Sequence, residues 1–185
     1  SFVLFQQFFC LQCGKQKVQS LHRINESTQG IWIGILEKER VVQLKGGMMM
    51  TKLTIQAVID RPVETVWEMW NEPEDIKRWN AASDDWHTTA SKNDLTVGGQ
   101  FTNRMEAKDG SMGFDFTGTY ETIVPHERIV YVLEDGRQVS IDFSRNGEQT
   151  EVVETFDAET MNPPEMQQAG WQAILDRFKA YAESK

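Results

Sequence analysis

The amino-acid sequence predicts one α+β domain, in which a curved antiparallel sheet of seven strands wraps around a long C-terminal helix. Three observations predict this fold. An amphipathic segment over residues 163–183 closes the chain, six strand-like runs separated by turn residues precede it, and one strand with two short helices precedes those runs. A helix with one apolar face has to bury that face, and a sheet wrapped around it is the simplest way to do so.

The first elements of this domain are a strand and two short helices. Residues 53–59 alternate between apolar and polar side chains and are rich in β-branched residues, as strands are. Asp60 is expected to cap the following helix, with Pro62 in its first turn, and Pro73 is expected to end it. A second short helix is expected over residues 74–79.

Six further strands are expected in the middle of the chain. Glycine, asparagine, aspartate and proline mark turns there, and the runs between these turns carry the alternating hydrophobicity of strands. Short turns between consecutive runs favour antiparallel pairing. The expected strands cover residues 86–94, 100–107, 112–124, 129–133, 138–144 and 150–157.

The C-terminal helix has two different faces. Its apolar stripe, at steps of three and four residues, consists of Trp171, Ile174, Leu175, Phe178, Tyr181 and Ala182. Asn162 is expected to cap the helix in a capping box with Glu165, while Pro163 and Pro164 occupy positions where a missing amide does no harm. The side chains expected to face water are Gln172, Asp176, Arg177, Lys179 and Glu183.

The period of two in each strand assigns one face of the sheet to the interior. This face carries many large rings, which seldom pack without gaps, so we expect either an internal pocket or a filled aromatic core. The candidate ligand-binding residues are Trp86, Phe101, Asn103, Met105, Phe114, Phe116, Tyr120, Ile141, Phe143, Glu154, Phe156, Trp171, Leu175 and Phe178. The residues expected on the outer face or in turns include Arg104, Asp115, Arg137 and Asp142.

Glu154 is the most unusual residue of the inner face, because it lies between Val152 and Phe156. Burial of its carboxylate without a hydrogen bond would cost several kcal/mol and would raise its pKa. Two interpretations are open. Glu154 lies at a sheet edge or rim and reaches water, or it is a polar group of the pocket that binds a ligand's hydroxyl or carbonyl, together with Asn103 and Tyr120.

Composition excludes several classes of partner. A hydrophobic content of 39% with 10% aromatic residues is that of a folded globular domain, whereas a net charge of −9 argues against nucleic acid and against an anionic membrane surface. The sequence has neither an apolar stretch long enough for a membrane helix nor the features of a signal peptide. We therefore expect a cytoplasmic protein that does not insert into a membrane.

The residue types that carry catalysis or bind metal form no recognisable motif. His22, His87 and His126 are too dispersed for a catalytic arrangement, and Cys10 and Cys13 have no second pair to complete a zinc site. We therefore assign no catalytic residue and no metal ligand, and we expect no cofactor.

Residues 1–49 differ in composition from the rest of the chain. They hold six of the 19 Lys and Arg but only three of the 28 Asp and Glu, and they lack periodicity before a short apolar run at residues 31–36. Residues 45–47 can be encoded by a ribosome-binding sequence read in frame, and three methionines follow at residues 48–50. We expect a non-globular extension over residues 1–49, upstream or added by cloning, and a domain over residues 50–185.

Four short phrases and the order of elements resemble a known family. The phrases are VGGQF at residues 97–101, GTY at 118–120, DGR at 135–137 and GWQAIL at 170–175. Together they resemble the SRPBCC, or START-like, superfamily, and within it bacterial proteins similar to the C-terminal domain of the activator of the ninety-kilodalton heat-shock protein's ATPase. The resemblance covers about residues 50–185.

This resemblance implies a helix-grip fold with a cavity between the curved sheet and the terminal helix. Relatives hold lipids, sterols, polyketides or flavonoid-like aromatic molecules there, and some cyclise polyketides. We therefore expect non-enzymatic binding of a small hydrophobic, aromatic or polyketide- or lipid-like molecule. One alternative is a cofactor-free cyclase or aromatase in which Glu154 or Tyr120 transfers a proton. The other is a partner of a heat-shock chaperone, although residues 1–49 do not resemble the N-terminal domain that the eukaryotic co-chaperone uses.

Overall fold

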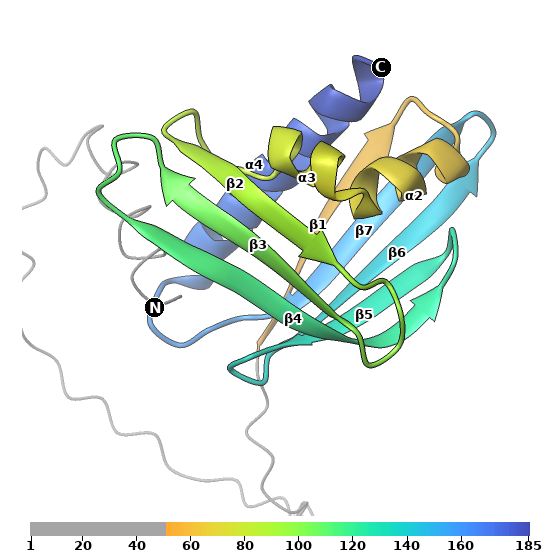
Figure 1. The fold of residues 1–185 in the computed structure, drawn as a ribbon. Coiled ribbons are helices and arrows are strands. Elements are labelled where there is room, and N and C mark those ends of the chain that lie inside the picture. Colours follow the sequence, from red (N-terminus) through yellow and green to blue (C-terminus); the bar gives the residue numbers. More distant parts are fainter. Residues whose placement is uncertain (1–50) are drawn as a thin grey trace, which may run out of the picture.

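The computed structural model describes residues 51–185, and the predictions for residues 1–50, including Cys10 and Cys13, lie outside the described residues. The predicted α+β helix-grip fold is confirmed (Figure 1). Along the chain, its elements are β1 (Lys52–Ile59), α2 (Val63–Asn71), α3 (Pro73–Trp79), β2 (Trp86–Asn93), β3 (Gln100–Ala107), β4 (Gly113–Val124), β5 (Arg128–Leu133), β6 (Gln138–Asn146), β7 (Gln149–Asp157) and α4 (Pro164–Glu183).

All seven described strands form one antiparallel sheet in the order β1-β7-β6-β5-β4-β3-β2. Strands β2 to β7 follow one another as hairpins, because short turns connect them. Helices α2 and α3 carry the chain from β1 at one edge to β2 at the other, which leaves β1 to pair with β7. Figure 1 shows the sheet curving around α4, so the apolar stripe of that helix meets the concave face.

The register places the predicted side chains on the inner face. Glu154 on β7 lies between Ile55 of β1 and Ile141 of β6, and all three are buried. A register shift in β4 between Tyr120 and Thr122 interrupts the alternation. Such a bulge bends the strand and increases its twist, and here it returns Ile123 to the core side.

Both predicted helix caps are wrong, and proline explains why. Pro163, rather than Asn162, is the N-cap of α4, and Pro62, rather than Asp60, is the N-cap of α2; neither helix has a side-chain cap. Pro164 disfavours helical geometry at the residue before it, so Pro163 is extended with ψ 139° and the helix starts after it. Asn162 instead donates from Nδ2 to Oε1 of Glu159 at 2.7 Å.

Gln167 organises the start of α4 in place of the predicted cap. Its Oε1 accepts the main-chain N–H of Glu159 at 2.9 Å, and its Nε2 donates to the carbonyls of Glu159 and Asn162 at 3.1 and 2.8 Å. The side chain is fully buried, with all its bonds directed at the loop that enters the helix. Gln167 therefore fixes how the chain crosses from β7 to α4.

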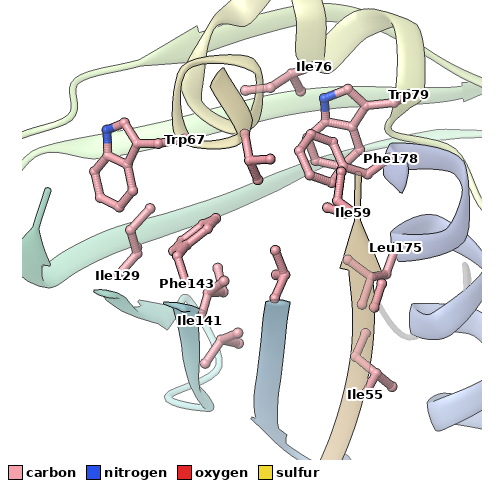
Figure 2. Close-up of a cluster of buried hydrophobic side chains, with 14 of the residues drawn as sticks. Ile55, Ile59, Trp67, Ile76, Trp79, Ile129, Ile141, Phe143, Leu175 and Phe178 are labelled. Atoms are coloured by element: carbon pink, nitrogen blue, oxygen red, sulfur yellow. The ribbon is translucent and has the colours of Figure 1, made fainter. Parts of the chain in front are cut away.

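The main hydrophobic core lies between α2, α3, the second half of α4 and the sheet. Phe178 of α4 is inaccessible to solvent and meets Trp70 and Trp79 with ring centroids 4.8 and 4.9 Å apart. Figure 2 shows Phe178 against Trp79, with Leu175 and Ile55 in the same cluster. A second, smaller cluster surrounds Trp86 and includes Met105 of β3 and Phe114 of β4. Helices α2 and α3 therefore fill one end of the space inside the curved sheet.

Candidate ligand-binding cavity

A cavity of about 120 Å³ lies inside the curved sheet, toward the first half of α4. Its walls come from strands β2 to β7, from α2 and α3 with the loop that follows, and from α4. Nine predicted residues line it, namely Phe101, Asn103, Met105, Phe114, Phe116, Tyr120, Ile141, Glu154 and Trp171. Both expectations for the interior hold in part, since the space is filled around Phe178 and open beside the start of α4.

Five predicted residues do not reach the cavity, although strand parity or the helical stripe places them inside. They are Trp86, Phe143, Phe156, Leu175 and Phe178. Phe143 packs its ring against Trp67 of α2, and Trp86 packs near Phe114 in the smaller cluster. Phe156 stacks on Trp171 at 4.1 Å with an interplanar angle of 11°, so it supports a cavity wall from behind.

Sequence reasoning missed the other lining residues, which include Trp70, Ile76 and Trp79 from the short helices and Gln167, Gly170 and Ile174 from α4. The α4 residues could have been found, because they lie one turn or less from Trp171 on the same helical face. Tyr131 could have been found by alternation along β5, since it faces the same side as Ile129. No such signal marked the residues of α2 and α3, because whether they line the cavity depends on how these helices pack against the sheet.

Several polar groups in the wall already have protein partners. The Tyr120 hydroxyl donates to Oδ1 of Asn93 at 2.8 Å, and Nδ2 of Asn93 donates to the carbonyl of Asn71 at 2.7 Å. Burial raises the pKa of Tyr120 above its usual range. Oδ1 of Asn103 accepts a hydrogen bond from the Ser91 hydroxyl at 2.7 Å. Tyr120, expected to hold a ligand, therefore connects β4 to β2 and to the end of α2.

Glu154 is the polar group that the fold leaves open to the cavity. Its side chain lines the cavity, the residue is only 6% exposed, and no residue in the range 51–185 donates a hydrogen bond to it. Burial raises the pKa of Glu154 to about 8, because a carboxylate loses the solvation it has in water. The interpretation as an edge or rim residue that reaches water is wrong, since β7 is paired on both sides and Glu154 is buried. At neutral pH the side chain is a neutral acid that can donate a hydrogen bond.

Tyr131 adds a second hydroxyl to the same wall. It faces Tyr120 across the β4–β5 pair and lies on the same side of the sheet as Glu154, with β6 between their strands. Burial, followed by the nearby charge of Glu154, raises the pKa of Tyr131 well above its usual value. Its hydroxyl is therefore protonated at any pH at which the protein would normally be studied.

Apart from Glu154, the charged residues between residues 51 and 185 do not line the cavity, and one of them is more buried than predicted. Arg104 pairs with Glu106 and Asp115 on the outer face, and Asp142 pairs with Arg128 there, as expected. Arg137 lies in the turn between β5 and β6, as expected, but it is only 2% exposed and binds Asp135 at 2.8 Å. Its charge acts on Tyr131 of β5 and Asp157 of β7, and strand parity does not predict this burial.

The described residues show no metal centre. Between residues 51 and 185, no three His, Cys, Asp or Glu side chains gather closely enough to hold a metal ion. His126 packs against the ring of Trp67, with centroids 5.7 Å apart, and neither it nor His87 lines the cavity. No helix between residues 51 and 185 is both long and apolar enough to cross a membrane.

A curved seven-stranded antiparallel sheet that grips a C-terminal helix over an apolar cavity defines a protein of the SRPBCC, or START-like, superfamily. Proteins of this superfamily commonly bind hydrophobic ligands. Within it, the chain belongs to the family described as "Activator of Hsp90 ATPase homolog 1-like protein", whose sequence model matches residues 60–183.

Three solved structures show how widely the fold is shared. An AHSA1-like protein from Aeromonas hydrophila is 54% identical, with a TM-score of 0.69, over 72% of this chain and 93% of that one. A protein from Cytophaga hutchinsonii is 49% identical, with a TM-score of 0.64, over 72% and 92%. At 22% identity, a Chromobacterium violaceum protein shares the fold, with a TM-score of 0.65 over 72% and 98%. Comparison with curated proteins gave no match.

Proposed function

We propose that this protein binds a small hydrophobic, aromatic molecule in the cavity and releases it unchanged. The observation that carries the proposal is an internal space of about 120 Å³ surrounded by aromatic rings and open polar groups. An apolar cavity of roughly 150 Å³ in another protein takes up benzene, whereas drug-sized ligands need roughly 300–1,000 Å³. The volume therefore favours a ligand of about one ring, and larger polyketides would require the walls to move.

The arrangement of the rings supports an aromatic ligand. Phe116 meets Trp171 at 6.2 Å and 81°, and Phe101 meets Tyr131 at 4.8 Å and 78°. Edge-to-face contacts of this kind are favourable between aromatic rings, and they leave ring edges and faces directed at the open space. A flat aromatic molecule can continue the same pattern of contacts, which a flexible alkyl chain cannot.

A thermal-shift experiment with single-ring aromatic compounds tests the proposal. A ligand that binds only the folded state stabilises it by RT ln(1 + [L]/Kd), or about 2.7 kcal/mol at a hundredfold excess over Kd. Phe116→Asp should abolish the shift because it places a charge in the cavity wall, whereas Asp142→Asn, on the outer face, should preserve it. If no aromatic compound shifts the unfolding temperature of the wild type, or both variants respond alike, the proposal fails.

A cofactor-free cyclase or aromatase is the second candidate, and Glu154 favours it, since a cavity carboxyl with a pKa of about 8 is suited to proton transfer near neutral pH. Turnover separates the two candidates. A binding protein returns its ligand unchanged, whereas an enzyme should lose product formation but keep its affinity in Glu154→Gln.

A chaperone partnership rests on the family description alone, and a pull-down with the cognate chaperone followed by an ATPase assay tests it.

A further inference from the structure

We propose that the cavity selects uncharged aromatic molecules that carry a hydrogen-bond acceptor, such as a ketone carbonyl, and that Glu154 and Tyr131 donate hydrogen bonds to this acceptor. The inference rests on the proposed function, because it specifies the chemical class of the ligand bound at the same site. It adds Tyr131 to the binding residues and excludes anionic ligands such as aromatic carboxylates and fatty acids.

The first argument is the position of unsatisfied donors. Glu154 is buried in the interior of the sheet and receives no hydrogen bond from residues 51–185, while Tyr131 is buried on the same wall. The hydroxyl of Tyr120, by contrast, is already bound to Asn93. A buried polar group without a partner costs free energy, so a ligand atom that accepts from Glu154 or Tyr131 recovers part of this cost.

The second argument is the charge of the wall. The residues that line the cavity include neither Lys, Arg nor His, and the titratable ones are Glu154, Tyr120 and Tyr131. A carboxylate ligand would lose its hydration without meeting a cation, and it would lie beside a carboxyl group. A neutral carbonyl of the same shape meets donors and carries no charge to desolvate.

The surroundings of Glu154 keep it in the donor form at neutral pH. Its neighbours across the strand pairs are Ile55 and Ile141, neither of which ionises. The cavity residues of α4 are Met166, Gln167, Gly170, Trp171 and Ile174, which are uncharged. Tyr131 and Tyr120 face the cavity from β5 and β4, and Arg137 acts on Tyr131 from the turn after β5. Burial therefore dominates the pKa of Glu154.

Three probes of nearly equal shape test the selection by calorimetry or by NMR titration of the full chain. They are acetophenone, which is neutral with an acceptor, ethylbenzene, which has no acceptor, and benzoate, which is anionic at neutral pH. At about pH 6.5, a net hydrogen bond should make acetophenone bind roughly threefold to tenfold more tightly than ethylbenzene. Benzoate should bind at least about tenfold more weakly than either neutral probe, since its charge has no partner in the cavity.

Variants test which side chains cause the preference for acetophenone over ethylbenzene. Glu154→Leu should bring the affinity ratio of acetophenone to ethylbenzene close to one, and Tyr131→Phe should lower it. Tyr181→Phe is the matched control, because the hydroxyl of Tyr181 binds Asp75 and the residue does not line the cavity, so this change should preserve the affinity ratio. Glu154→Gln keeps a donor that does not titrate. Its ratio should stay constant up to about pH 9.5, whereas the wild-type ratio should fall as the pH rises through about 8.

The outcomes separate this inference from the proposed function. Equal binding of acetophenone and ethylbenzene by the wild type would overturn the selection and leave aromatic binding intact. Tighter binding of benzoate than of the two neutral probes would overturn the selection as well. A preference for acetophenone that survives in both Glu154→Leu and Tyr131→Phe would remove these two residues from the site. If none of the three probes binds, the proposed function fails together with the inference.

Discussion

The side chain of Gln172 binds the backbone of Gln56 in the way that a neighbouring strand would. The main-chain N–H of Gln56 donates to Oε1 of Gln172 at 3.4 Å, and Nε2 of Gln172 donates to the carbonyl of Gln56 at 3.2 Å. Gln168 donates to the carbonyl of Thr54 at 2.7 Å, one helical turn earlier. Since β1 is an edge strand, these side chains of α4 satisfy backbone groups that would otherwise be open to another chain.

Replacing both glutamines should expose this edge. Gln168→Met with Gln172→Met preserves side-chain length and helix propensity but removes the hydrogen bonds, so unfolding should require about 1–2 kcal/mol less. The freed edge should also promote self-association, which sedimentation at increasing protein concentration would measure. Gln138→Met is the control, because Gln138 binds the side chain of Glu121 on the outer face. Identical behaviour of the control and the double variant would show that α4 does not protect the edge.

Glu154 should make the stability of the wild type fall with rising pH. Its pKa is about 8 in the folded protein and 4.5 in the reference state, so between these values the folded state holds a proton that the unfolded state has released. The stabilisation is complete below about pH 4.5 and is lost as the pH rises through 8, with a slope of up to about 1.4 kcal/mol per pH unit.

Glu154→Gln should remove this contribution to the slope, since the amide does not titrate. Urea unfolding at a series of pH values measures it, and the variant should gain most relative to the wild type above pH 8. Glu151→Gln, on the solvent-facing side of the same strand, provides the control for other effects of the substitution. A wild type and a Glu154→Gln variant with parallel pH profiles would contradict the buried, unpaired state of Glu154.

Two phenylalanines should distinguish the filled core from the cavity wall. Phe178→Ala removes an inaccessible ring that contacts both Trp70 and Trp79, and should cost about 3–5 kcal/mol of unfolding free energy. Phe116→Ala removes a half-buried ring that already borders empty space, so it should cost about 1–2 kcal/mol and enlarge the cavity. Chemical denaturation measures both values, and equal losses would mean that no open space adjoins Phe116.

Because Gly118 has no side chain, the ring of Phe101 on β3 can lie against β4 at this position. A Cβ at this position would lie 2.6 Å from Cε1 of Phe101, closer than atoms can approach, and 3.1 Å from Cδ2 of Tyr131, which is a tight contact. Gly118→Ala should therefore displace the Phe101 ring, cost about 1–3 kcal/mol and weaken aromatic binding.

Gly113→Ala in the same strand is the matched control for Gly118→Ala. Its new Cβ would meet the flexible end of Arg104 and the side chain of Glu106 on the outer face, both of which can move. Denaturation and ligand titration of the two variants should therefore differ. If Gly118→Ala is as stable as the control and binds aromatic compounds as tightly, the position of the Phe101 ring does not depend on the absence of a side chain at residue 118.

The alternation of residues along the chain was enough to predict the order of elements, the sheet and its inner face. Val139, Ile141 and Phe143 are buried as predicted, because a strand side chain can face only one of two sides. The helix caps were not predicted correctly, since Asn162 and Asp60 are typical capping residues and the effect of the following prolines outweighed that preference.

By itself, the sequence determined which side chains face inward, including the carboxyl of Glu154, because local periodicity is a property of each element alone. Tertiary structure decided which inward residues meet empty space and which meet each other. Phe178 and Trp171 share one helical stripe, yet α2 and α3 cover the first, and the second borders the cavity. It also decided that Gln172, predicted to face water, binds the edge of β1. The position of a helix against a sheet depends on packing summed over many distant residues, so no local pattern encodes it.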